Sequence, residues 1–340
     1  MNYEGYIIAP FELFSSCCSF LWDWKGRVFP QRALFASALA GAHLWFYIQR
    51  ISTNDLRTSG QNSDTQQKGV VTSMNSLQLR NRILFDTDPV NFAGECEKVR
   101  QEAAKIFAAG AEAGSCTAIA VRELTIDLQS YLVKWNLQSG DHPVAKEALE
   151  QEVSAFYRLL SSYGYAQEVR AAKQEAQSIQ KSNIYQISMM TDQGILNNRI
   201  GNDAYYGLTD SMRRGCVLVT TNPVMINSAC HDLGETKCRA LKEKIKQEFP
   251  NATTAELVTY MTAELVYEYC QELWPVYKAS NGEYGYVSLQ VNPRNSGDSE
   301  KMFAELDLIY SMISQRLSGV PNLVFKVPAT GAGLDTVYKM

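Results

Sequence analysis

The stretch NLVFKVPATGAGLD, residues 322–335, places a lysine inside an apolar run. Apolar side chains flank Lys326 on both sides, and Pro328 and two glycines close the run. Such a run predicts a short buried strand. Strands that are apolar on both faces are typical of a parallel sheet. The stretch therefore predicts a parallel α/β fold with an amine in its interior.

Lys326 has two interpretations. Burial disfavours the charged form of an amine and lowers its pKa. A neutral amine can attack a carbonyl carbon and form a Schiff base, which withdraws electrons while a neighbouring C–C bond breaks. Alternatively, the lysine pairs with a buried carboxylate or extends its charged end to solvent.

Three other strand-like runs precede this stretch and alternate with helical patterns. The four runs span residues 183–191, 216–222, 284–292 and 322–328, and amphipathic helices are predicted between them. This alternation is typical of a parallel α/β fold. Polar residues lie in or just after the ends of the last three runs, and ligands of parallel α/β folds bind at the carboxyl ends of strands. The residues in question are Thr220, Asn222, Gln290, Arg294, Lys326 and Thr330.

Composition limits the classes of protein that fit. The chain has 340 residues, with 46% hydrophobic and 20% charged residues, which is an ordinary globular balance. The net charge of −4 gives no basic surface for nucleic acid. Eight cysteines, none in a CxxC pair, predict reduced thiols and a cytoplasmic location. Cys230, His231 and Cys238 are too few and too widely spaced for zinc, so no metal is expected.

Four segments differ in character. Residues 1–50 are apolar and aromatic, 51–78 form a polar linker, 79–182 are mainly helical, and 183–340 are α/β. The apolar stretch 33–49 is shorter than the roughly 20 residues of a membrane-spanning helix. We therefore favour a buried or interfacial helix there and expect no membrane partner. The helical segment carries no recognisable chemistry and is interpreted as an extension or interaction module.

Three motifs together resemble a known family. LVTTNPVMI (218–226), YVSLQVNPR (286–294) and LVFKVPATGAGL (323–334) resemble, in this order, the second, third and fourth strands of transaldolases and fructose-6-phosphate aldolase-like proteins. These enzymes are (β/α)8 barrels of the class I aldolase type and use no cofactor. The resemblance implies that residues 183–340 form the first half of such a barrel. It also implies a transferase that moves a dihydroxyacetone unit between sugar phosphates in the pentose phosphate pathway.

The resemblance also implies roles for particular residues. Lys326 would form the Schiff base, and Asn222 would hydrogen-bond the substrate beside it. Thr220 would line the pocket, and Thr330 would help to position a catalytic water. Transaldolases have a glutamate at the position of Gln290, which points instead to a fructose-6-phosphate aldolase-type lyase as the alternative, because glutamine orients water but accepts no proton. Arg294 is a further candidate for substrate binding.

The acid/base of the family is an aspartate at the end of the first strand. Asp192 follows the more strand-like run, residues 183–191, whereas Asp203 has the spacing to Thr220 that the family favours. Both remain candidates.

The chain ends inside what would be the fourth helix of a barrel, which typically needs about 250 residues. We therefore expect a C-terminally truncated chain in which Lys326 lies on an open edge strand, and we expect no measurable transaldolase or aldolase activity from these 340 residues. Open edges favour pairing with another chain, so a homo-oligomer is expected. A second alternative is an inactive homologue that acts as an interaction protein.

Overall fold

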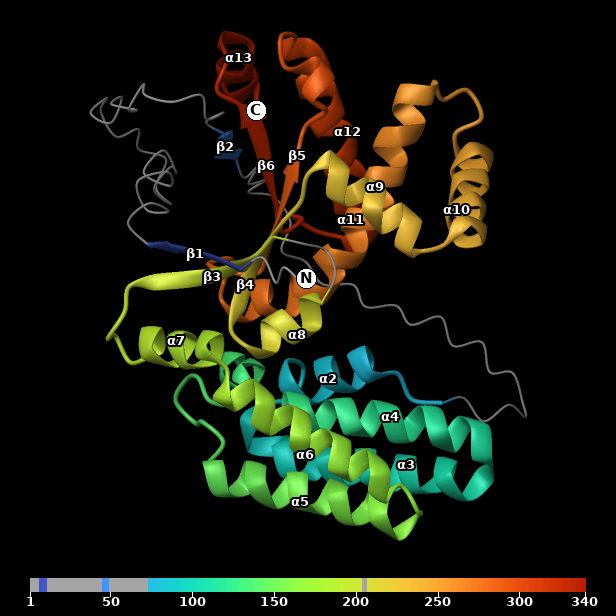
Figure 1. Cartoon of the computed structure of the whole chain (residues 1–340), viewed down its shortest axis with the longest axis vertical. Helices are drawn as coiled ribbons and strands as arrows, with labels where there is room; N and C mark the ends of the chain where they lie inside the picture. The colour runs from blue at the N-terminus through green and yellow to red at the C-terminus, as the bar shows by residue number, and fades with distance from the viewer. Residues whose placement is uncertain (1–5, 11–44, 49–72, 204–206) are drawn as a thin grey trace.

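The computed structural model describes residues 6–10, 45–48, 73–203 and 207–340. A helical region precedes an α/β region, and the two pack together through one continuous core (Figure 1). The elements of the helical region are α2 (Ser76–Leu84), η1 (Pro89–Asn91), α3 (Phe92–Ala109), α4 (Ala111–Asp127), η2 (Tyr131–Trp135), α5 (Lys146–Ser162), α6 (Ala166–Lys181) and α7 (Asn183–Asp192).

The α/β region alternates strands with helices along the chain. Its elements are β3 (Asn198–Asn202), α8 (Leu208–Arg213), β4 (Cys216–Thr220), α9 (Pro223–Asp232), α10 (Glu235–Glu248), α11 (Thr254–Ala279), β5 (Tyr286–Gln290), η3 (Pro293–Asn295), α12 (Ser299–Leu317), β6 (Leu323–Pro328) and α13 (Gly331–Lys339). The strands β3, β4, β5 and β6 are parallel neighbours in this order. This arrangement confirms the predicted α/β class and is consistent with part of a (β/α)8 barrel.

Two short strands from the N-terminal part of the chain lie at the edges of this sheet. The strand β1 (Tyr6–Pro10) pairs antiparallel with β3, and β2 (Trp45–Ile48) pairs antiparallel with β6. The prediction of a helix over residues 33–49 is therefore wrong for residues 45–48, and the other residues of that stretch lie outside the described part of the chain. Among the described residues, no helix is long and apolar enough to cross a membrane.

The helices of the helical region form because apolar residues recur at three-to-four spacing. In α5, the buried residues Leu149, Val153, Phe156 and Leu160 form one face. In the view of Figure 1, α3, α4, α5 and α6 lie in a group below the sheet. The helical region begins within the predicted linker 51–78, because Asn75 caps α2 by accepting a hydrogen bond from the Gln78 backbone N–H at 3.1 Å.

The prediction of a first strand over residues 183–191 is wrong, because this run forms helix α7. The Ser182 hydroxyl caps it by accepting a hydrogen bond from the Tyr185 backbone N–H at 3.3 Å. The first parallel strand is β3, with the sequence NRIGN. Its pairing with β4 and β1, rather than a hydrophobic pattern of its own, defines it as a strand.

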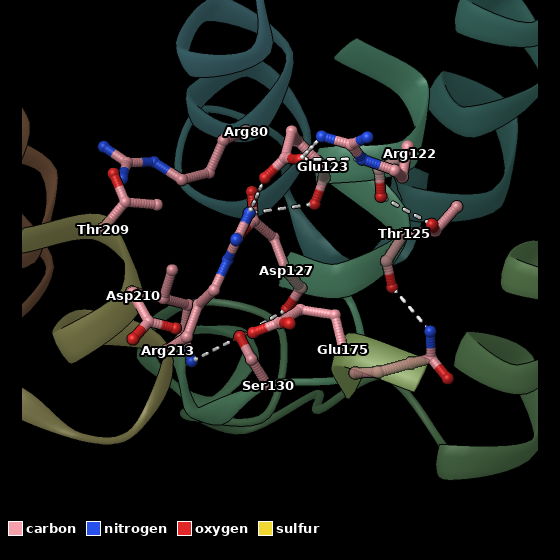
Figure 2. A network of polar contacts seen from close by, with 12 residues as sticks. Arg80, Arg122, Glu123, Thr125, Asp127, Ser130, Glu175, Thr209, Asp210 and Arg213 are labelled. Atoms are coloured by element: carbon pink, nitrogen blue, oxygen red, sulfur yellow. Dashed lines mark hydrogen bonds and ion pairs between the residues drawn. The ribbon is translucent and has the colours of Figure 1, made fainter. Parts of the chain in front are cut away.

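A buried network of charged side chains joins the helical region to the α/β region (Figure 2). Arg213, the last residue of α8, donates from Nε to Asp127 Oδ1 at 2.6 Å and from Nη2 to Glu123 Oε2 at 2.8 Å, and both acidic residues lie on α4. Arg80 of α2 donates from Nη2 to the Glu272 carbonyl of α11 at 3.0 Å. The network therefore fixes α8, which connects β3 to β4, against α4, and it joins α2 to α11.

Candidate functional site

One face of the parallel sheet carries polar side chains and the other face carries apolar ones. Thr220 pairs with Ser288, and Gln290 pairs with Lys326, in adjacent parallel strands. Residues that pair in register lie on the same face, and residues two apart along a strand share it. Thr220, Ser288, Gln290 and Lys326 therefore share one face, which we call the polar face.

The opposite face of the sheet is almost completely buried. Its residues are Val217, Val219, Val287, Leu289, Leu323, Phe325 and Val327. Burial alternates along β6, since Val324 and Lys326 are half-buried while their neighbours in the strand are buried. Lys326 thus lies within an apolar sequence without facing the apolar core.

Asp203 reaches the polar face from the end of β3. It comes directly after the last residue of that strand, and its carboxylate accepts a hydrogen bond from the Thr220 hydroxyl. Burial lowers the pKa of Lys326, and the nearby negative charge of Asp203 opposes this shift in part. A lowered pKa increases the fraction of neutral amine at a given pH, which is the form that attacks a carbonyl.

Gln290 is the last residue of β5 and lies beside Lys326 on β6. Ser288, two residues earlier, is fully buried, and its hydroxyl has no hydrogen-bond partner among the described residues. Sequence reasoning missed Ser288. The signal that could have found it is its position two residues before Gln290, which places it on the same face of the strand.

Asn222 lies two residues after β4, where it caps helix α9. Its side-chain oxygen accepts a hydrogen bond from the Met225 backbone N–H at 3.0 Å, and Pro223 occupies the first helical position. Because the cap uses the carboxamide oxygen, a substrate contact would come from the amide nitrogen.

Thr330 is exposed and uses its hydroxyl in the loop after β6. The hydroxyl accepts from the Gly333 backbone N–H at 3.0 Å and donates to the Ser296 carbonyl at 2.9 Å. Gly333 is required here, because a Cβ atom would lie 1.8 Å from the Pro328 carbonyl oxygen. Thr330 thus joins the loop after β6 to the loop after β5.

Arg294 lies in η3 and is exposed. Its guanidinium makes no ion pair or hydrogen bond with the part of the chain that the structure describes. Glu305 of α12 holds the start of this loop, since its carboxylate accepts from the Asn292 backbone N–H at 3.1 Å and from the Asn295 side-chain amide at 3.0 Å. Arg294 is therefore at the carboxyl end of β5, but no contact joins it to Lys326.

Asp192 makes its contacts in the helical region and not on the polar face. It is the last residue of α7 and forms an ion pair with Lys134 of η2. The Lys134 ammonium also lies 4.1 Å from the centre of the Tyr131 ring. The structure therefore places Asp192 in the helical region and Asp203 at the end of the first parallel strand.

The edge of the sheet beside Lys326 is not open. The strand β2 pairs antiparallel with β6, and Tyr47 is opposite Lys326 in the register. The expectation that Lys326 lies on an open edge strand is therefore wrong. It failed because the strand that covers the edge comes from the N-terminal segment and not from the α/β region.

Comparison with known proteins adds independent support for the motifs. Residues 210–340 match the family described as Transaldolase/Fructose-6-phosphate aldolase. Asp203 lies before this range, so the family match does not include it.

Curated transaldolases match the same part of the chain. The transaldolase of Frankia alni is 35% identical over 126 residues, which cover 36% of this chain and 31% of that protein. The transaldolase of Parafrankia sp. is 33% identical, with 36% and 31% covered, and Transaldolase 1 of Streptomyces avermitilis is 34% identical, with 36% and 30% covered. The matched part of the chain thus spans a little under a third of the length of these relatives. Over residues 210–340, the chain is therefore identified as similar to the transaldolase/fructose-6-phosphate aldolase family, which confirms the resemblance that its strand motifs predicted.

Proposed function

We propose that the chain carries the Schiff-base site of a transaldolase-like enzyme that transfers a dihydroxyacetone unit between sugar phosphates. The observation that supports this most is the position of Lys326, half-buried and with a lowered pKa, beside Gln290 on the polar face. Asp203 lies close enough to influence its charge and is hydrogen-bonded to Thr220. Similarity to the family over residues 210–340 supports the same chemistry.

In this proposal, the neutral amine of Lys326 attacks the carbonyl carbon of a ketose phosphate, and loss of water gives an iminium ion. The iminium accepts the electron pair of the adjacent C–C bond as that bond breaks. Asp203 takes the proton from the hydroxyl of the carbon that becomes an aldehyde. The aldose phosphate leaves, and the enamine that remains adds to the aldehyde of a second aldose phosphate.

The other residues of the site would bind rather than react. Gln290 would orient the water that is released when the iminium forms and the water that later hydrolyses it, since a carboxamide can donate and accept hydrogen bonds. Asn222 would donate from its amide nitrogen to a substrate hydroxyl, and Thr220 would hold Asp203 in place. Arg294 would contact the anionic substrate from the edge of the sheet. Thr330 would act through the loop it fixes, because backbone groups use its hydroxyl. No cofactor, a cytoplasmic location and a place in pentose phosphate metabolism complete the proposal.

Gln290 favours a second candidate, a fructose-6-phosphate aldolase-type lyase, because it replaces the proton-accepting glutamate of transaldolases. The two reactions differ in the fate of the three-carbon unit. We expect a lyase to release free dihydroxyacetone from fructose 6-phosphate when no acceptor aldose phosphate is present. The measurement is a coupled assay for dihydroxyacetone with and without erythrose 4-phosphate, with Lys326→Met as the blank. Transfer to the acceptor without any release of dihydroxyacetone would favour the transaldolase.

The pH dependence of Lys326 gives a test of the role of Asp203. The amine becomes reactive as pH rises through its lowered pKa, and the charge of Asp203 holds that pKa up. Asp203→Asn is therefore expected to move the midpoint of the pH profile to lower pH. The profile is the initial rate at which cyanoborohydride traps dihydroxyacetone on Lys326.

Asp192→Asn is the matched control, because Asp192 pairs with Lys134 in the helical region. It should leave the midpoint unchanged. A midpoint that rises in Asp203→Asn, or that moves equally in both variants, would contradict the placement of Asp203 beside Lys326.

A further inference from the structure

The cysteines in the described part of the chain fall into three groups by exposure. Cys96, Cys216 and Cys270 are buried, and Cys116 is exposed. Cys230 and Cys238 are partly exposed and lie close to each other. Burial raises the pKa of Cys216 to about 12, which keeps it protonated and unreactive. Among these residues, Cys230 and Cys238 are therefore the two thiols that are both partly exposed and close to another thiol.

The fold brings these two thiols together across a tight turn between helices. Cys230 lies in the last turn of α9, and Cys238 lies in the first turn of α10. Gly234, with φ of +79°, reverses the chain between the helices, and the Cys238 backbone N–H donates to the Gly234 carbonyl at 3.0 Å. Helices α9 and α10 contact each other, and the Cys238 thiol lies close enough to Cys230 to raise its pKa. Figure 1 shows α10 at the outer edge of the molecule, where a small oxidant can approach.

We propose that Cys230 and Cys238 form a reversible disulfide that links α9 to α10 when the chain meets a small-molecule disulfide such as oxidised glutathione. This modification site goes beyond the proposed function and does not depend on it. The sequence predicts reduced thiols for the chain at rest, and the oxidised form is the state that the proposal adds.

The two thiols have different roles in this reaction. Burial and the neighbouring Cys238 thiol raise the pKa of Cys230 to about 11, so Cys230 is the thiol that reacts second. Cys238 lies near the start of α10 and is the thiol that reacts first. The Cys238 thiolate attacks one sulfur of oxidised glutathione, and one glutathione thiolate leaves. Cys230 then loses its proton to solvent, attacks the Cys238 sulfur and releases the second glutathione. Two protein thiols are oxidised, and one glutathione disulfide is reduced to two thiols.

The link has a structural consequence for the site. Helix α9 begins at Asn222, its N-cap, and ends near Cys230. Oxidation would therefore fix the far end of the helix whose first turn Asn222 caps, and it would hold α9 and α10 in one arrangement.

Peptide mapping tests the proposal on the whole chain. Trypsin cleaves after Lys237, so Cys230 lies in the peptide 215–237 and Cys238 lies in the dipeptide 238–239. After treatment with oxidised glutathione and digestion without reductant, the peptide 215–237 is expected to carry the dipeptide 238–239 and to lose it on reduction. The link should survive in Cys216→Ser and Cys116→Ser and disappear in Cys230→Ser.

Two results would overturn the proposal. One is a mixed disulfide between Cys238 and glutathione, with no linked peptide, in the chain that carries no cysteine substitution. The other is a linked peptide that persists in Cys230→Ser, because Cys216 would then be the partner. Both outcomes are measured on protein that is oxidised in its folded state, and neither requires catalytic activity. The test is therefore independent of the test of Lys326.

Discussion

Replacing Arg213 by alanine is expected to lower the free energy of unfolding by about 3–5 kcal/mol, because the change leaves a buried carboxylate without its partner. The side chains of Arg213 and Asp127 are only 7% and 2% exposed, and they are joined by a hydrogen bond of 2.6 Å. The measurement is urea denaturation followed by circular dichroism, with the midpoint and slope fitted together.

An exposed ion pair gives the matched control. The side chains of Arg239 and Glu235 on α10 are 70% and 84% exposed, so Arg239→Ala should change the free energy of unfolding by less than about 1 kcal/mol. The double variant Arg213→Met with Asp127→Leu should recover much of the lost stability, since it removes both charges together. Equal effects of Arg213→Ala and Arg239→Ala would show that the buried ion pair stabilises the chain no more than an exposed one.

Replacing Lys326 by methionine is expected to abolish adduct formation with a ketose, a loss of about a thousandfold or more, because no other group can replace the nucleophile. Methionine keeps the length and apolar stem of the side chain, so the fold should be preserved. The measurement is the yield of adduct after borohydride reduction, read by intact mass.

Lys339→Met is the control for this variant, because Lys339 pairs with Glu300 at the surface of α13 and α12. It should retain the full yield of adduct. If the adduct persists in Lys326→Met, the assignment of the Schiff-base lysine is wrong.

Most of the parallel sheet could be predicted from local sequence. The predicted runs 216–222, 284–292 and 322–328 contain β4, β5 and β6. These strands have apolar residues on one face that pack against helices, so their alternation is visible without knowledge of the fold. The helices α11 and α12 could be predicted for the same reason.

The strands at the ends of the sheet could not be predicted in this way. In β3, Ile200 is the only large apolar residue, and pairing with both neighbours stabilises the strand. The run 183–191 has a more strand-like composition but forms α7, because Ser182 caps it and its helical face packs against the helical region. Tertiary contacts outweighed local propensity at both places.

The residues of the candidate site divide in a similar way. Lys326, Asn222 and Gln290 follow from strand position and motif, and their placement at strand ends could be predicted. The use of the Thr330 hydroxyl in a cap and a loop contact depends on how two loops approach each other. The same is true of Asp203, whose hydrogen bond with Thr220 depends on the pairing of β3 with β4.

Borohydride trapping with identification of the modified residue tests the central claim most directly. The chain is incubated with fructose 6-phosphate or dihydroxyacetone, reduced with borohydride and digested with trypsin. Modification of Lys326 blocks cleavage after that residue, so a Schiff base at Lys326 predicts a single modified peptide spanning residues 317–339. A chain that yields only the unmodified peptide 317–326, or carries its adduct on another lysine, would contradict the proposal that Lys326 is the Schiff-base residue.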